Sequence, residues 1–129
     1  MEKILGKFSG KLYGLLRIVA GFMFMQHGAQ KILGLLGAEH PVQLFSKMGL
    51  AGAIELIGGL LIMSGIFTSW AAFLASGLMA VGYFTVHAPD SFWTVINRGE
   101  LAVLYCFVFL YLASRGNGEL SLGKLLGKG

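Results

Sequence analysis

The segment HGAQK, residues 27–31, lies inside a long apolar run, LYGLLRIVAGFMFMQHGAQKILGLL, which extends from residue 12 to residue 36. The run is long enough to cross a lipid bilayer, for which a helix needs about 20 apolar residues. It nevertheless contains Arg17, His27 and Lys31. Ionisable groups at membrane depth are costly, so they are usually paired or functional. The rest of the sequence therefore has to supply partners for these groups.

The composition is that of an integral membrane protein. Of the 129 residues, 56% are hydrophobic and 12% are charged, whereas about a quarter of the residues of a soluble domain are charged. The mean hydropathy is +0.75. A single cysteine, Cys106, excludes an intramolecular disulfide and C-x-x-C chemistry. The net charge of +4 resides mainly at the two ends of the chain, so no nucleic-acid partner is indicated.

The hydrophobic pattern predicts an all-α membrane protein, a bundle of four transmembrane helices that forms one domain over residues 1–129. We expect spans at about residues 12–36, 50–67, 70–88 and 95–114, with short basic tails at both ends. Between Leu56 and Pro89 the chain has no Asp, Glu, Lys or Arg. This stretch is too long for one crossing but suits two crossings joined by a turn near residues 65–70.

The distribution of basic residues predicts the orientation. The loop 37–49 holds only Lys47, and the loop 88–97 holds no lysine or arginine. The two tails together contain Lys3, Lys7, Lys11, Arg115, Lys124 and Lys128. Because cytoplasmic segments carry the excess of Lys and Arg, we expect both the N-terminus and the C-terminus to be cytoplasmic.

This topology is expected to bring polar groups from all four spans into one layer near the outer face. His27 and Lys31 are four residues apart and share a helix face. Our candidates for ligand binding or proton relay are His27, Lys31, Glu55, His87, Asn97 and Glu100. Arg17 and Arg98 are interpreted as structural or interfacial residues. Arg17 is expected to extend to cytoplasmic headgroups or to pair locally.

A lysine in a low-dielectric environment needs a carboxylate nearby to stay charged. Either Glu55 or Glu100 could neutralise Lys31, and the sequence does not decide between them. An alternative is that such pairs only fix the register of the helices. His27 and His87 could also be axial haem ligands, but no further haem signal is present. No metal site is expected.

Four short motifs now occur in a recognisable order. An arginine early in the first span precedes HG-x-x-K, which comprises His27, Gly28 and Lys31. In the second span Glu55 is followed by Gly58, Gly59 and Gly65, and the fourth contains Asn97, Gly99 and Glu100. Over about residues 12–113 this pattern resembles the DoxX family.

The resemblance implies a small multi-pass protein of the bacterial or archaeal inner membrane, with four helices. Members of the family include the quinone-reducing membrane subunit of a thiosulfate:quinone oxidoreductase and membrane partners of enzymes that handle oxidative stress and sulfur. The polar site that it implies consists of Arg17, His27, Lys31, Glu55, Asn97 and Glu100.

Three hypotheses for function follow, and whether the protein is an enzyme stays open. In the first, it is a membrane subunit of an oxidoreductase whose polar layer binds a quinone between Phe24, Tyr83 and Phe84, with no covalent cofactor. In the second, it is a non-catalytic scaffold in the lipid bilayer. Such a scaffold would recruit a soluble oxidoreductase or another membrane subunit through its tails, or form a homo-oligomer. The third, a small transporter, is the least favoured because no inverted repeat is evident.

Overall fold

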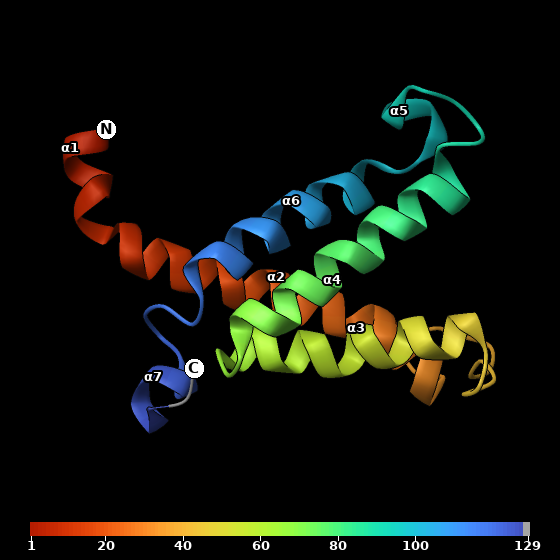
Figure 1. Ribbon diagram of the computed structural model, residues 1–129, viewed down its shortest axis with the longest axis horizontal. Coiled ribbons are helices and arrows are strands. Elements are labelled where there is room, and N and C mark those ends of the chain that lie inside the picture. Colours follow the sequence, from red (N-terminus) through yellow and green to blue (C-terminus); the bar gives the residue numbers. More distant parts are fainter. Residues whose placement is uncertain (128–129) are drawn as a thin grey trace.

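A computed structural model describes residues 1–127, and over this range the chain is helical with connecting turns and loops (Figure 1). Lys128, one of the basic residues used to predict the orientation, lies outside the described residues. In chain order the helices are α1 (Glu2–Leu5), η1 (Gly6–Phe8), α2 (Ser9–Leu33), α3 (Lys47–Ser64), α4 (Thr68–Gly82), η2 (Tyr83–His87), α5 (Thr94–Asn97), α6 (Glu100–Arg115) and α7 (Leu122–Leu126).

Three helical segments of the described chain are long and apolar enough to cross a membrane. They are Glu2–Leu33, which joins α1, η1 and α2, then α3, and Thr68–His87, which joins α4 and η2. The fourth predicted span corresponds to α6, which has 16 residues and is about 24 Å long at ~1.5 Å per residue. A hydrocarbon core is about 30 Å thick, so the fourth crossing stays a prediction.

The helix ends differ by a few residues from the predicted spans, and local backbone chemistry explains the differences. Helix α2 ends early because Gly34 adopts the left-handed conformation, with φ of 64°. Helix α3 begins early because the Ser46 hydroxyl accepts a 3.0 Å hydrogen bond from the Gly49 amide. Helix α6 begins late because Arg98, with φ of 61°, interrupts the helix after α5.

The helices form two hairpins that pack on each other. Helix α2 lies along α3, and α4 lies along α6, while α3 and α4 join the hairpins through a turn at residues 65–67. Figure 1 shows both ends of the described chain at the same end of the molecule, where the hairpins meet. The hairpins diverge toward the opposite end, where α2 ends and α6 begins.

Glycines allow α2 and α3 to approach closely. A Cβ atom added at Gly28 would collide with the backbone of Leu56, and one added at Gly59 would lie 2.6 Å from the backbone nitrogen of Met25. Small residues at such positions let the backbones of membrane helices come into contact. Contact between the helices therefore requires Gly28, the second residue of HGAQK.

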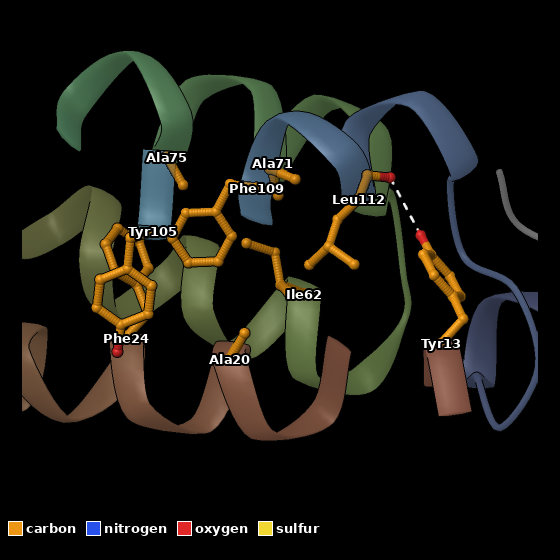
Figure 2. Packing of buried hydrophobic residues seen from close by; sticks show 10 residues of the cluster. Tyr13, Ala20, Phe24, Ile62, Ala71, Ala75, Tyr105, Phe109 and Leu112 are labelled. Carbon is orange, nitrogen blue, oxygen red and sulfur yellow. Dashed lines mark hydrogen bonds between the residues drawn. The ribbon is translucent and has the colours of Figure 1, made fainter. Parts of the chain in front are cut away.

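Aromatic rings fill the centre of the molecule, between the two hairpins (Figure 2). Phe24 of α2 packs against Phe109 of α6 with 4.7 Å between ring centroids, and Tyr105 stacks on Phe109 at 5.1 Å. Alanines of α4, including Ala72, leave room for these rings. Large apolar side chains also cover the exterior, among them Val19, Phe22, Leu60, Phe73, Leu74 and Phe107. Lipid is the environment that suits such a surface.

Arg17 is fully buried, with 0% exposure. Its Nε donates to the Ile62 carbonyl at 3.0 Å, and its terminal nitrogens donate to the carbonyls of Asn117, Glu119 and Leu120 at 2.5, 2.8 and 2.6 Å. The expectation that Arg17 extends to lipid headgroups is wrong, because a guanidinium has five donors and these carbonyls can accept them inside the protein.

The C-terminal segment is consequently bound to the helices. The Asn117 side-chain oxygen accepts a 3.1 Å hydrogen bond from the Thr68 amide at the start of α4, and the Gly123 amide donates to the Gly65 carbonyl at 3.0 Å. The Tyr13 hydroxyl donates to the Gly116 carbonyl at 2.5 Å. Residues 116–123 therefore close one end of the fold, whereas the scaffold hypothesis treated this tail as a separate docking segment.

Substitution of Arg17 tests its structural role. We expect Arg17→Ala to lower the free energy of unfolding by about 3 kcal/mol or more, because several buried carbonyls lose their donor. Arg115→Ala is the control, since Arg115 is exposed and lies over the Tyr13 ring at 4.6 Å, a contact worth about 1 kcal/mol or less. Equal losses in detergent-solubilised protein would contradict this role.

A second pair of variants tests the close approach of α2 and α3. Gly28→Ala is expected to destabilise the protein by about 2 kcal/mol or more, because the added methyl group forces two backbones apart. The control is Gly77→Ala on α4, where a Cβ meets nothing within 4 Å. Thermal unfolding of both variants in the same detergent provides the comparison, and an equally stable Gly28→Ala protein would refute the packing.

Candidate functional site

The last two turns of α2 present His27 and Lys31 on one face. Lys31 lies in the final turn, where the partial negative charge of the helix C-terminus favours a cation. The chain leaves α2 immediately afterwards at Gly34. Lys31 is thus held at the end of a helix, near the divergent ends of the two hairpins.

Lys31 forms an ion pair with Glu55 of α3. The ammonium nitrogen lies 2.7 Å from one carboxylate oxygen and 2.8 Å from the other. The Glu55 side chain is 5% exposed and that of Lys31 is 24% exposed. Gly52 permits the contact, because a Cβ there would lie 2.8 Å from the Lys31 Cβ. The sequence left Glu55 and Glu100 as alternative partners of Lys31, and the structure shows that Glu55 is the partner. Glu100 is exposed at the start of α6.

A cleft of about 430 Å³ lies beside this ion pair. Both hairpins contribute to its walls, through the C-terminal turns of α2, α4 and η2 and the N-terminal turns of α3 and α6. Its ionisable lining residues are His27, Lys31, Glu55, His87 and Arg98, and its apolar or aromatic ones include Phe24, Met79, Leu101 and Tyr105. Apolar walls with a few convergent polar groups are typical of small-molecule sites of this size.

His87 enters the cleft from the other hairpin, at the end of η2. Its Nδ1 lies 2.9 Å from the backbone carbonyl oxygen of Asn97. Its ring stacks on that of Tyr83, with 6.4 Å between centroids and 25° between planes. Helix η2 is a π-helix, a form that is frequent at functional sites. The ring of His87 is therefore fixed both at its edge and on its face.

Asn97 supports the cleft from behind. It is 3% exposed, and its Nδ2 donates to the Tyr83 hydroxyl at 3.1 Å and to the Ser91 carbonyl at 2.9 Å. Its Oδ1 accepts from the Gly99 amide at 2.8 Å. These bonds join the start of η2 and the loop at Ser91 to the start of α6. They engage the side chain within the protein, so Asn97 does not line the cleft.

Tyr105 is a cleft residue that the sequence analysis missed. Its side chain is 5% exposed, and its hydroxyl has no hydrogen-bond partner within the described residues. Figure 2 shows the ring beside Phe24, with its oxygen directed toward α2. His27 approaches it edge-on, with 6.4 Å between ring centroids. A buried hydroxyl without a partner is unfavourable, and this one belongs to a residue that lines the cleft.

The structure brings some of the predicted site residues together and separates others. His27, Lys31, Glu55, His87 and Arg98 line one cleft. Glu100 instead lines a separate hollow of about 440 Å³, together with Arg98 and Thr94, and Arg17 lies at the other end of the molecule. Phe84, expected beside the ligand, is 70% exposed and does not line the cleft.

Metal-ligating side chains do not cluster in the described part of the chain. No group of three or more His, Cys, Asp or Glu residues is close enough to hold a metal ion within residues 1–127.

Comparison with known proteins identifies the family. The sequence model of the DoxX family matches residues 12–88. The chain belongs to the DoxX family. This match includes the three elements that supply His27, the Lys31–Glu55 pair and His87. The family expected from the sequence motifs is thereby confirmed.

Relatives extend over most of the chain. An uncharacterized protein of Haemophilus influenzae is 36% identical over 92% of this chain and 92% of its own length. A Bacillus subtilis protein named "Putative oxidoreductase CatD" is 30% identical over 89% of this chain and 87% of its own length. No solved structure matches the chain significantly.

The energetics of the ion pair can be measured with a double-mutant cycle. We expect Lys31→Met to cost about 3 kcal/mol of stability, because it leaves the Glu55 carboxylate buried without a cation. The double variant Lys31→Met with Glu55→Gln should recover most of that loss, since no charge remains unpaired. Chemical unfolding in detergent micelles measures the free energy of unfolding of each variant. Additive effects of the two substitutions would show that the pair is not coupled.

Proposed function

We propose that this DoxX protein is a membrane component of a redox system and that its cleft binds a quinone-type ring. The observation that carries the proposal is the convergence of the Lys31–Glu55 pair, His87 and the buried Tyr105 hydroxyl on one apolar-walled cleft of about 430 Å³. The relative named as an oxidoreductase supports the redox assignment. When bound, a quinone supplies reversible transfer of electrons and protons.

The side chains of the cleft suit a ring that carries oxygen atoms. An ammonium group has three protons, and Lys31 directs hydrogen bonds to the two carboxylate oxygens of Glu55. One Lys31 proton remains for a ligand oxygen, and the Tyr105 hydroxyl offers another. Phe24, Met79 and Leu101 line the same cleft and can pack against the ring faces.

The ion pair also keeps the cleft suitable for an uncharged ligand. Glu55 neutralises Lys31, so a neutral ring that enters does not have to displace a separate counter-ion. Arg98 is exposed at the edge of the cleft and adds a fixed positive charge there.

The proposed location is the bacterial inner membrane, with the cleft in its outer half. Both ends of the described chain lie at one end of the molecule. The tails hold most of the basic residues, which favours the cytoplasmic side for that end. The cleft is built from the opposite ends of the helices. In this arrangement α6 is the fourth crossing, and an electron-transfer partner docks on the bilayer-embedded protein.

Filling the cleft tests the proposal. Gly82 lines the cleft, and a Cβ added there meets nothing within 4 Å, so Gly82→Leu should occupy the ligand space without a backbone clash. We expect this variant to weaken binding of tetramethyl-p-benzoquinone or its hydroquinone by about tenfold or more. Calorimetric titration of the protein in lipid nanodiscs measures the affinity.

The matched control is Gly77→Leu on the same helix. Gly77 is equally open to an added side chain, but it lies outside the cleft, next to Phe73 and Val81. The affinity of the Gly77→Leu variant for the two rings should stay within about twofold of that of the unmodified protein, a difference of about 0.4 kcal/mol. If neither ring binds the unmodified protein, or if both leucine variants bind equally well, the proposed function is incorrect.

A second candidate function is a scaffold without a ligand, and one observation favours it. Both oxygens of Glu55 are hydrogen-bonded to Lys31, which is what a purely structural pair requires. On this alternative the cleft contains only lipid or water. The Gly82→Leu variant should then bind its redox partners at the membrane as well as the unmodified protein does.

A further inference from the structure

We propose that His87 makes the cleft select the hydroxylated (reduced) form of the ring over the quinone form. Its Nε2 atom would accept a hydrogen bond from a ring hydroxyl. The cleft then prefers a hydroxylated aromatic ring, such as a hydroquinone or a phenol, over the corresponding quinone. This inference rests on the proposed function and adds the chemical class that the cleft recognises.

The first step concerns the proton on the His87 ring. Nδ1 lies 2.9 Å from the Asn97 carbonyl oxygen, and a carbonyl oxygen can only accept a hydrogen bond. Nδ1 therefore carries the proton and donates it. In a neutral imidazole the other nitrogen then has a free lone pair. Within the described residues Nε2 makes no hydrogen bond, and His87 lines the cleft.

The second step concerns the part of the structure that fixes this tautomer. The carbonyl that receives the Nδ1 proton belongs to Asn97, whose side chain is bonded to Tyr83, Ser91 and Gly99. Tyr83 in turn stacks on the His87 ring. Asn97 is thus a positioning residue, since it holds the carbonyl and, through Tyr83, the plane of the imidazole.

The third step compares the hydrogen-bonding groups that face the ligand. Lys31 and Arg98 can only donate, and the Tyr105 hydroxyl is unpartnered. Both oxygens of Glu55 are engaged by Lys31. When its ring is uncharged, His87 adds an acceptor of fixed orientation that no cation shares, beside the lone pairs that remain on the Glu55 oxygens. His27 also lines the cleft, but no hydrogen bond fixes its tautomer in the described chain.

These groups distinguish a hydroxyl from a carbonyl. A ring hydroxyl can accept from Lys31 or Tyr105 and donate to Nε2 of His87. A quinone carbonyl can accept, but opposite Nε2 it would place one lone pair against another. Such a mismatch leaves Nε2 without a donor and places two lone pairs against each other, which is unfavourable. We expect a preference of about tenfold for the hydroxylated ring.

The tautomer can be measured without any ligand. Nitrogen NMR of histidine-labelled protein in nanodiscs at pH 8 distinguishes protonated from bare ring nitrogens, and His87→Gln identifies the signals of His87. We expect a protonated Nδ1 and a bare Nε2, the reverse of the tautomer that free histidine prefers. A proton on Nε2 would overturn the inference, whatever the cleft binds.

Binding measurements test the selectivity. Under anaerobic conditions the unmodified protein should bind tetramethyl-p-hydroquinone about tenfold more tightly than tetramethyl-p-benzoquinone. His87→Phe should abolish this preference, whereas His87→Gln should keep most of it, because the glutamine amide oxygen can accept near the position of Nε2. Equal affinities for the two rings, or an unchanged preference in His87→Phe, would overturn the selectivity alone. If neither ring binds, the proposed function is refuted as well.

Discussion

The close approach of α2 and α3 is the constraint on which the rest of the structure depends. Gly28 and Gly59 bring the two backbones into contact, and Gly52 admits the stem of Lys31. At a larger separation the ammonium could not lie 2.7 and 2.8 Å from the two oxygens of Glu55. Small residues on the helices thus convert two costly charges in an apolar environment into a mutually neutral pair.

The hydrogen bonding of buried polar groups differs between the two ends of the molecule. At one end Arg17 donates four hydrogen bonds to backbone carbonyls, and residues 116–123 close the hairpins around it. At the other end the hairpins diverge and the Tyr105 hydroxyl has no partner among the described residues. The buried Thr68 hydroxyl at the closed end also has no partner among the described residues, so the open end is distinguished by the cleft that Tyr105 lines.

Much of this arrangement could be predicted from residue type and spacing. The helical membrane character, the family and Lys31 with a nearby carboxylate all follow from apolar length and from ionisable groups within it. The backbone role of Arg17 could not be predicted, because carbonyl partners leave no trace in the side-chain sequence. Tyr105 was missed because the run 101–113 appears uniformly apolar, and only packing reveals which of its rings has a buried hydroxyl.

The burial of Arg17 also has a consequence for the order in which the protein is made. Arg17 belongs to the first long helix, yet three of the carbonyls that it binds belong to residues 117–120. During synthesis this guanidinium enters the membrane long before those acceptors leave the ribosome. Until then it has to remain hydrated or borrow partners from lipid or the insertion machinery. The hydrogen bonds of Arg17 can therefore be completed only after residues 117–120 have been made, so a chain that is interrupted before them keeps an unsatisfied guanidinium.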